Sequence, residues 1–397
     1  MTGEDLPDGR DTDDEVVAAV AGAFPTREVA AVAPVRTGNR KRTVVVRLAG
    51  EEPPQSVVVQ TAPDAAVLRT EAALARSIGA RTPLPVPAVV AGGSFPDRTS
   101  AYLVTEHAPG EDLHTRFVDL PAGTRETMAR EFGGFLAALH GAFAFEGYGP
   151  VALDEAGGAS GPARGQPPRS PDDAEPDLEV EGTAWAAVLD AADPGERLAV
   201  DVAGGAGDTR EPAAADGPEY PGDPDGSVPP ATADWPAWLA RYASAGVDAL
   251  PAAFDDLRPR IEGAIADARE TLPASPPATL YPWDLRPGNA LVADGTVTAV
   301  LDWGQPLSAA PGLAVAKAEH LVCDWYVDDG APLRAAFRAG YRDRRPLPPV
   351  PAVYRLVAVV RSAVDGAGVV TRPRYPEVDG DDALAFHRER IEAALDG

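Results

Sequence analysis

Residues 280–304 read LYPWDLRPGNALVADGTVTAVLDWG, and three polar side chains stand out in this stretch: Asp284, Asn289 and Asp302. Asp284 and Asn289 lie five residues apart on either side of the turn-forming sequence Arg286-Pro287-Gly288. Two short apolar runs then flank Asp294-Gly295, a dipeptide typical of two-residue β-hairpins. We therefore expect the hairpin to fold Asp302, at the end of its second strand, back beside the loop that carries the other two residues.

The three residues supply two carboxylates and one amide, which are hard oxygen ligands. Magnesium ions are typically held in proteins by one or two carboxylates together with substrate phosphates. Phosphoryl transfer also needs a carboxylate that accepts or orients the proton of the attacking hydroxyl. The stretch therefore predicts a phosphoryl-transfer site. The alternative is a local turn in which Asp284 and Asn289 cap backbone amides and Asp302 ends a strand.

The first hundred residues predict a small antiparallel sheet and a helix that crosses it. Two runs rich in Val and Thr, residues 42–48 and 56–61, are joined by a proline-containing turn and predict a hairpin. Apolar residues at helical spacing predict a helix over residues 68–78. Residues 87–90 and 100–106 predict two further strands. A short helix is expected over residues 15–24.

The rest of the chain reads as mostly helical, with an acidic interruption. Helical apolar faces run over residues 124–140 and 235–265, and two prolines interrupt the second pattern. Residues 154–234 hold 19 acidic and 4 basic side chains and are dense in Gly, Pro and Ala. We interpret them as an acidic, low-complexity insertion in a surface connection, the alternative being a functional lid. Within this insertion, residues 185–189 and 198–202 are expected to pack locally.

The composition limits the classes of function. The 397 residues hold 35 Lys and Arg against 61 Asp and Glu, and the formal net charge of −26 disfavours binding to nucleic acid or to an anionic membrane. Only Lys41 and Lys317 are lysines. An acidic, lysine-poor chain resembles proteins of extreme halophiles, because molar salt screens charges over only about 3 Å. The single cysteine, Cys323, excludes an internal disulfide.

No stretch approaches the roughly 20 uncharged apolar residues of a membrane span. The first residues also lack the basic end and the apolar run of a secretory signal. We therefore expect a cytoplasmic, halophilic protein whose partners include neither nucleic acid nor membrane. The alternative function of the acidic surface is attraction of a cationic ligand.

Together these features resemble the aminoglycoside phosphotransferase family, which includes choline and homoserine kinase-like enzymes with a protein-kinase-like fold. The stretch at 280–304 is similar to the family's catalytic and metal loops. Further matches are Gly38-Asn39 before the hairpin, Glu71 on the crossing helix, Pro85-Val86-Pro87, the segment from Tyr102 to Gly110, and Leu139-His140 at a helix end. The resemblance spans about residues 30–150 and 235–345.

The resemblance implies an α+β, protein-kinase-like fold of two lobes. An acidic flexible N-terminus, residues 1–15, would precede an N-lobe at 16–108 that binds nucleotide with a small antiparallel sheet and one crossing helix. A mostly helical C-lobe, residues 109–397, would carry the catalytic and acceptor-binding residues and contain the acidic insertion at 154–234. The implied cofactors are ATP and Mg²⁺.

Carried over residue by residue, the resemblance implies roles in the site. Asp284 is the implied catalytic base, and Arg286 beside it would neutralise the transferred phosphate or form a salt bridge within the loop. Asn289 and Asp302 are the implied metal ligands. The implied nucleotide-binding residues are Gly38, Asn39, Gln60, Glu71, Glu106, His107 and Ala108, the last three through backbone hydrogen bonds to adenine.

Two positions depart from the family pattern. Gln60 stands where the family usually has a Lys or Arg that pairs with the phosphates and with the helix glutamate, so a full charge is missing. The candidate replacements, each expected instead to be an exposed strand charge, are Arg40, Lys41 and Arg47. Pro282 stands where a histidine commonly braces the loop, and its fixed φ together with Trp283 can rigidify the loop by another route.

These observations leave two functions open. The first is a phosphotransferase with an alcohol group as acceptor, which transfers the γ-phosphoryl group of ATP to a hydroxyl of a small molecule. The alternative is a weak or inactive pseudokinase that binds nucleotide or a partner in the same cleft, and Gln60 and Pro282 motivate it. A binding protein in which the motif is fortuitous would not respond to Mg²⁺.

Residues 316–326 fall where the family's acceptor pocket begins. The candidate acceptor-binding residues are Glu319, Asp324 and Trp325, whose acidic and aromatic groups suit an amine or a sugar face. The alternative is a core helix with inward side chains at Leu321, Val322, Trp325 and Tyr326. His140 and His320 are expected to be packing residues, and Cys323 a buried small hydrophobe.

Overall fold

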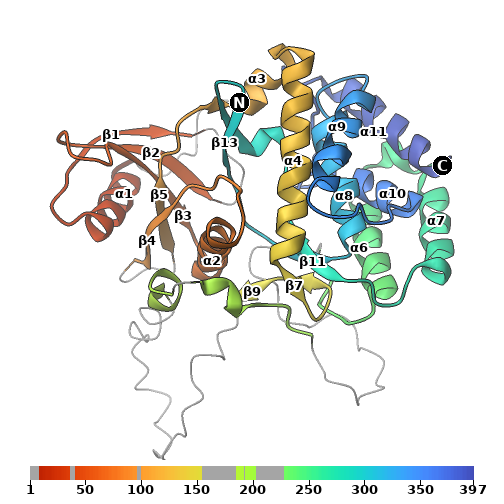
Figure 1. The fold of residues 1–397 in the computed structure, drawn as a ribbon, viewed down its shortest axis with the longest axis horizontal. Helices are drawn as coiled ribbons and strands as arrows, with labels where there is room; N and C mark the ends of the chain where they lie inside the picture. Colours follow the sequence, from red (N-terminus) through yellow and green to blue (C-terminus); the bar gives the residue numbers. More distant parts are fainter. Residues whose placement is uncertain (1–8, 36–40, 96–99, 154–184, 192, 203–227) are drawn as a thin grey trace, which may run out of the picture. The chain divides into compact units, whose positions relative to one another are not determined.

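A computed structural model describes residues 9–35, 41–95, 100–153, 185–191, 193–202 and 228–397 (Figure 1). The chain divides into two compact units. Unit 1 comprises Met1–Ala80, Pro87–Ala108 and Leu153–Ala199, and unit 2 comprises Arg81–Val86, Pro109–Ala152 and Val200–Gly397. Gly38 and Asn39, the predicted nucleotide loop, lie outside the described residues.

Unit 1 contains a five-stranded antiparallel sheet with the strand order β1-β2-β3-β5-β4. Its strands are β1 (Val29–Pro34), β2 (Arg42–Leu48), β3 (Ser56–Ala62), β4 (Val89–Ser94) and β5 (Ala101–Glu106). Alternating valines in β2 and β3 point to one face, where they form a core with Val16 and Val20 of helix α1 (Gly9–Ala23). The predicted hairpin of β2 and β3 is confirmed, whereas the sequence did not predict β1.

The predicted crossing helix is α2 (Ala65–Arg81), which buries Leu68, Leu74 and Ile78. Two pieces of the acidic insertion also pack in unit 1, as expected: Trp185 and Val188 are buried, and so is Leu198 of the short strand β10 (Leu198–Ala199), which follows the 3₁₀ turn η4 (Pro194–Arg197). A Cβ atom on Gly92 would lie 2.2 Å from the Trp185 ring, so only glycine fits there. The insertion residues 154–184, 192 and 203–227 lie outside the described part.

Unit 2 is mostly helical. Its helices are α3 (Leu113–Arg116), α4 (Ala122–Ala142), α6 (Trp235–Ala249), α7 (Arg258–Thr271), α8 (Pro311–Glu319), α9 (Ala331–Arg342), α10 (Ala352–Val360) and α11 (Gly380–Leu395), with short 3₁₀ turns η1 (Phe117–Asp119) and η5 (Ala252–Phe254). The long helix α4, yellow in Figure 1, packs along α9. Gly133 of α4 and Gly340 of α9 permit this approach, because a Cβ atom on either would lie 1.9 Å from a carbonyl oxygen of the other helix.

Two small sheets complete unit 2. The four-stranded sheet has the order β7 (Ala144–Phe145), β11 (Ala278–Tyr281), β14 (Leu307–Ala309) and β8 (Gly149–Pro150). The three-stranded sheet has the order β13 (Thr296–Val300), β12 (Ala290–Ala293) and β6 (Glu111–Asp112). Strand β9 (Ala152–Leu153) pairs with β10 in a separate two-stranded sheet. No helix among the described residues is both long and apolar enough to cross a membrane.

Candidate active site

The loop after β11 carries the first predicted site residues. Every residue of β11 is buried, so this strand fixes the point at which the chain turns into Asp284. The 3₁₀ turn η6 (Pro287–Asn289) follows, and the backbone N–H of Asn289 donates to the carbonyl of Arg286 at 3.0 Å. The side-chain Nδ2 of Asn289 donates to the carbonyl of Asp284, also at 3.0 Å. Asn289 therefore closes the loop onto Asp284.

The hairpin that follows returns the chain to this loop. β12 and β13 pair antiparallel, with Ala290 opposite Val300. The connecting residues Asp294 and Gly295 both have positive φ, 51° and 75°, as the expected two-residue hairpin turn requires. One residue beyond β13, the N–H of Leu301 donates to the carbonyl of Asn289 at 2.8 Å. The predicted hairpin is thus confirmed, and Asp302 directly follows the residue bonded to Asn289.

Asp302 is exposed and has a φ of 61°, in the left-handed region that few residues other than glycine adopt. Such a conformation costs roughly 1–3 kcal/mol and persists where the surroundings fix it. The neighbouring Trp303 is buried, and its Nε1 donates to the carbonyl of Val300 at 3.1 Å. The buried tryptophan anchors the strand end while the Asp302 carboxylate stays at the surface.

Arg286 and Asp284 form an ion pair within the loop, with 3.0 Å between Nη2 and Oδ2. Each side chain is about one quarter exposed. Burial by itself would lower the pKa of the Arg286 guanidinium, but attraction to Asp284, Tyr326 and Asp302 outweighs it and raises the pKa. The guanidinium also lies 5.8 Å from the centre of the Trp325 ring. The salt bridge considered for Arg286 is therefore present.

Trp283, next to Asp284, is held by cations and an aromatic ring. Lys317 Nζ lies 5.8 Å and Arg361 Cζ 5.3 Å from the centre of its ring, and the Tyr242 ring lies at 6.1 Å. Lys317 is buried and donates to the carbonyl of Arg361 at 3.0 Å and to Ser362 Oγ at 2.6 Å. Burial lowers the pKa of Lys317 to about 7.

The family pattern has a histidine that braces the loop at the position of Pro282. In this chain, the contacts of Trp283 with Lys317, Arg361 and Tyr242 brace the loop. The sequence did not predict the role of Lys317 or of Arg361. One feature of the sequence could have indicated that Lys317 has a special role, because it is one of only two lysines in a chain with 35 basic residues.

In unit 1, the predicted helix glutamate has a cationic partner. Lys41 Nζ lies 2.7 Å from Oε2 and 2.9 Å from Oε1 of Glu71. The two side chains are only 14% and 6% exposed, so the expectation that Lys41 is an exposed strand charge was wrong. Arg47, in contrast, is exposed as expected, and Arg40 lies outside the described residues.

The sheet register shows on which face of the sheet Lys41 lies. Arg42 pairs with Thr61 and Thr43 with Gln60, so the same register extended by one residue places Lys41 opposite Ala62. Side chains alternate along a strand, which puts Lys41 on the face of the sheet that Gln60 occupies, one strand away. A cation therefore lies directly before β2, on the face of the sheet that Gln60 occupies.

The predicted adenine-binding segment ends β5. The N–H of Glu106 donates to the carbonyl of Ala88 at 2.9 Å, so the sheet already uses this donor. His107 is exposed, and its Nδ1 lies 2.9 Å from Ser56 Oγ. The backbone N–H of Glu106 is therefore not free for the adenine contact that the sequence predicted for this segment.

Comparison with known proteins identifies the family and the fold of the chain. The sequence matches the phosphotransferase enzyme family (APH) over residues 31–201 and 210–355. The chain belongs to this family. The match also includes most of the acidic insertion, which the expected resemblance left outside. No curated protein matches the chain.

Solved structures of similar fold include several aminoglycoside phosphotransferases. An apo thermostable mutant of APH(4)-Ia is 15% identical to this chain, with a TM-score of 0.57. A ternary complex of such a mutant with ADP and hygromycin B is 16% identical, with a TM-score of 0.56. The GDP and kanamycin complex of APH(2″)-IIIa shares 14% and 0.53. Each alignment covers 96% of this chain and 98% of the other. The predicted α+β, protein-kinase-like fold of this phosphotransferase is confirmed.

The donor set of the phosphotransferase fits Mg²⁺. The described residues contain no group of three or more His, Cys, Asp or Glu that could hold a metal ion by themselves. Asn289 and Asp302 offer an amide oxygen and a carboxylate, and Mg²⁺ usually takes one or two carboxylates together with phosphates and water. Because Nδ2 of Asn289 is bonded to Asp284, the amide oxygen is the group left for a ligand.

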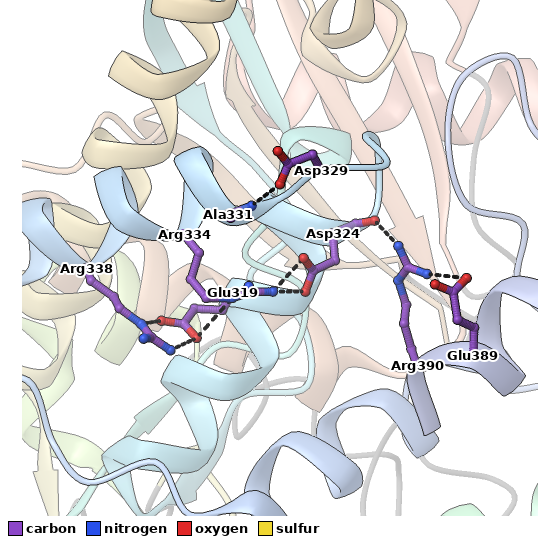
Figure 2. Close-up of polar contacts among 8 residues, drawn as sticks. All are labelled: Glu319, Asp324, Asp329, Ala331, Arg334, Arg338, Glu389 and Arg390. Carbon is purple, nitrogen blue, oxygen red and sulfur yellow. Dashed lines mark hydrogen bonds and ion pairs between the residues drawn. The ribbon is translucent and has the colours of Figure 1, made fainter. Parts of the chain in front are cut away.

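The acidic residues predicted to bind the acceptor are engaged with arginines of α9 (Figure 2). Arg338 contacts both oxygens of Glu319, at 2.5 and 2.9 Å, and Arg334 contacts both oxygens of Asp324 at 2.6 Å. The Glu319 side chain is only 4% exposed. Any acceptor that binds these carboxylates must compete with two guanidinium groups.

The segment that follows α8 is a π-helix (His320–Asp324), and its first four side chains are buried. The four residues of the core-helix alternative, Leu321, Val322, Trp325 and Tyr326, are all buried, and so is Cys323, as expected. His140 is a packing residue: its Nδ1 lies 2.8 Å from Tyr341 Oη, and burial lowers its pKa to about 3. Burial also holds the pKa of His320 well below its usual range.

Proposed function

We propose that this phosphotransferase transfers the γ-phosphoryl group of ATP to a hydroxyl group of a small molecule. One observation carries the proposal: Asn289 bonds through its side chain to Asp284 and through its carbonyl to Leu301, next to Asp302. A carboxylate that can take a proton is thereby linked to two oxygen donors that can hold a metal. Related structures that contain ADP, AMP-PNP or GDP support a nucleotide as phosphoryl donor.

Asp284 is the proposed base. Arg286 occupies its Oδ2, so Oδ1 is the oxygen that orients the acceptor hydroxyl. The O–H bond of the acceptor breaks, and its oxygen bonds to the γ-phosphorus. The bond between the γ-phosphorus and the oxygen that bridges it to the β-phosphate breaks, and ADP leaves. The proton passes to Asp284, while Arg286 is placed to balance negative charge on the transferred group.

Asn289 and Asp302 are the proposed metal ligands, and a bound Mg²⁺ would neutralise charge on the phosphates. Lys41, paired with Glu71, is the proposed phosphate-side cation in place of Gln60. This pair favours an active enzyme over the pseudokinase alternative, because the missing charge motivated that alternative. The cytoplasm, where ATP is available, is the proposed location.

Thermal unfolding of the full-length protein in molar KCl, with ATP or GTP and with or without Mg²⁺, tests the proposal. A ligand that binds the native state raises the melting temperature by mass action. We expect a Mg²⁺-dependent shift that Asp302→Ala reduces. The absence of any nucleotide-dependent shift would overturn the proposed function.

Turnover tests the base separately. We expect Asp284→Asn to abolish phosphorylation of hydroxyl acceptors and to leave the nucleotide-dependent shift in place. Asp343→Asn, a change at an exposed surface ion pair, is the matched control and should retain activity. Wild-type turnover in Asp284→Asn would remove the assignment of the base.

A further inference from the structure

Helix α8 places the buried amine of Lys317 beside the residue that precedes the proposed base. Lys317 is only 3% exposed, and its Nζ atom lies 5.8 Å from the centre of the Trp283 ring. Trp283 is the residue directly before Asp284. An ammonium group over an aromatic ring at this distance is attracted to it, most strongly where water is excluded. Lys317 therefore anchors the loop one residue before Asp284.

The hydrogen bonds of Lys317 show how many of its N–H groups are in use. Nζ donates to the carbonyl of Arg361 at 3.0 Å and to Ser362 Oγ at 2.6 Å. Ser362 in turn donates its single hydroxyl proton to the carbonyl of Ala358 at 2.7 Å, so towards Lys317 it can only accept. Both partners thus require an N–H of Lys317. An ammonium group has three, which leaves one for the Trp283 ring.

The contact with Trp283 depends on the charge of Lys317. A neutral amine has two N–H groups, and the two hydrogen bonds described above occupy both. Its lone pair then takes the third position and faces the ring, whose face carries partial negative charge. The attraction to the ring is lost while both hydrogen bonds remain. Arg361, whose Cζ lies 5.3 Å from the ring centre, stays as the second cation.

Lys317 changes its charge near neutral pH. Burial is the largest cause that lowers its pKa, from 10.5 to about 7, and the cations Arg361 and Arg286 act in the same direction. The carboxylate of Asp284 opposes them. The charge of Lys317 is thus coupled to the proposed base as well as to the ring before it.

The histidines packed near α8 stay neutral around pH 7. Burial lowers the pKa of His140, on α4, to about 3 and that of His387, on α11, to about 4. It also holds the pKa of His320 well below its usual range. Burial raises the pKa values of the thiol and phenol groups packed there, which are Cys323, Tyr281 and Tyr354. Near pH 7 the charge that changes beside the Trp283 ring is therefore that of the buried lysine.

We propose, resting on the kinase function above, that Lys317 is a positioning residue whose protonated form holds Trp283 and thereby keeps Asp284 aligned with the acceptor hydroxyl. Loss of the proton releases the ring on one side, and the loop that carries Asp284 becomes less well fixed. The ion pair between Asp284 and Arg286 remains, so the loop keeps its overall path. Turnover therefore falls as the pH rises through 7, whereas Mg-ATP, which the proposed metal ligands hold, binds as before.

Fluorescence of Trp283 tests the charge-dependent contact without any acceptor. The wild-type spectrum minus that of Trp283→Phe isolates this ring from the other tryptophans. We expect this difference to change with a midpoint near pH 7 in the wild type. In the background of Lys317→Met the same difference should stay flat, because the titrating amine is gone. A wild-type difference that is flat between about pH 5.5 and 9 would overturn the inference.

Turnover tests the effect on Asp284. The full-length enzyme receives Mg-ATP with water as the probe acceptor, and ADP release is followed from about pH 6 to 8.5. We expect kcat to fall about tenfold, or 1.4 kcal/mol, across this range with an unchanged KM for Mg-ATP. Lys317→Arg, whose guanidinium stays charged, is the conservative variant and should lose the decline. A decline in both proteins, or in neither, would overturn the positioning role.

Trp283→Leu covers the case in which changes at the buried Lys317 prevent folding. This variant keeps the lysine and removes the ring that it holds, so kcat should be low and free of the step near pH 7. A retained step in Trp283→Leu would overturn the inference. Asp343→Asn, at the exposed ion pair with Arg130, is the control and should keep the wild-type profile.

The two readouts separate the failure of this inference from that of the proposed function. A fluorescence transition without ADP release and without a Mg-ATP thermal shift would overturn the kinase function, and the positioning role with it. A Mg-ATP thermal shift and ADP release without a fluorescence transition would overturn only the role of Lys317.

Discussion

The ammonium group of Lys41 lies within 2.9 Å of both carboxylate oxygens of Glu71, although the two residues are 30 positions apart. Kinases of this general fold place a lysine on the third strand and pair it with a glutamate of the adjacent helix. Here the third strand carries Gln60, and Lys41 lies directly before β2, on the same face of the sheet. A lysine–glutamate ion pair is therefore present, with its cation directly before β2 and not on β3.

We therefore predict that Lys41→Met lowers kcat/KM for Mg-ATP by about 10²–10³, the usual loss when one charge-stabilising donor of a transition state is removed. Adding Gln60→Lys to this variant should restore a large part of the activity, because position 60 faces the same side. Steady-state kinetics in molar KCl measures both effects.

Arg47→Met is the control for this pair of variants. Arg47 lies on β2 but is exposed, so its removal should leave kcat/KM unchanged. Full activity in Lys41→Met would show that the Lys41–Glu71 pair serves only the fold of unit 1.

A second prediction concerns the Glu319–Arg338 pair. Glu319 is buried, and removal of Arg338 takes away its bidentate partner and leaves only the weaker contact with Arg334, whose Nε lies 3.8 Å from Oε2. We expect Arg338→Met to lower the free energy of unfolding by up to about 3–5 kcal/mol, and Glu319→Gln with Arg338→Met to recover part of that loss. Urea denaturation measures the change.

The exposed pair Arg130–Asp343 provides the comparison for this experiment. Arg130→Ala should cost less than about 1 kcal/mol, because solvent screens an exposed pair. Equal losses in Arg338→Met and Arg130→Ala would contradict the role assigned to burial.

A third prediction follows from the close contact of α4 and α9. A Cβ atom on Gly133 would meet the carbonyl oxygen of Phe337 at 1.9 Å, and a backbone atom cannot move aside cheaply. Gly133→Ala should therefore destabilise the protein by about 1–3 kcal/mol. At Gly263 of α7 nothing lies within 4 Å, so Gly263→Ala should stabilise it by up to about 1 kcal/mol. Thermal unfolding distinguishes the opposite signs.

Local sequence patterns predicted the helices and turns whose residues follow the spacing that the element requires. The apolar face over residues 124–140 appears as α4, and Asp294-Gly295 makes the expected hairpin turn. Strand β1, VAAVAP, carries only two β-branched residues and a proline, so no strand pattern marks it. Helix α10, AVYRLVAVV, is rich in valine, a residue of low helix propensity. Burial of its side chains in the core outweighs that propensity and keeps the segment helical.

In the candidate site, the sequence revealed the contacts that one hairpin brings together and missed those made across the fold. Asp284, Asn289 and Asp302 lie within 19 residues, and two local turns, η6 and the hairpin turn at Asp294-Gly295, join them. The partner of Glu71 depends instead on pairing of β2 with β3, and the partners of Glu319 and Asp324 come from α9. Such pairings leave no periodic pattern in the sequence, because the register of paired strands or the packing of helices determines them.

The last prediction concerns the buried amine of Lys317, which donates to the carbonyl of Arg361 and to Ser362 Oγ. Burial, with Arg361 and Arg286 acting in the same direction and Asp284 opposing, lowers its pKa from 10.5 to about 7. The unfolded chain therefore binds more protons than the folded protein between pH 7 and 10.5, so Lys317 makes the free energy of unfolding rise with pH across that window.

Lys317→Met removes this titration, and its lost hydrogen bonds cost the same at every pH. We expect the stability of the wild type minus that of Lys317→Met to increase by an amount on the order of 4 kcal/mol from pH 7 to 10.5. Urea denaturation of both proteins at intervals of pH gives this difference and cancels the histidines and tyrosines that titrate in both. A flat difference would mean that Lys317 keeps an ordinary pKa in the folded state.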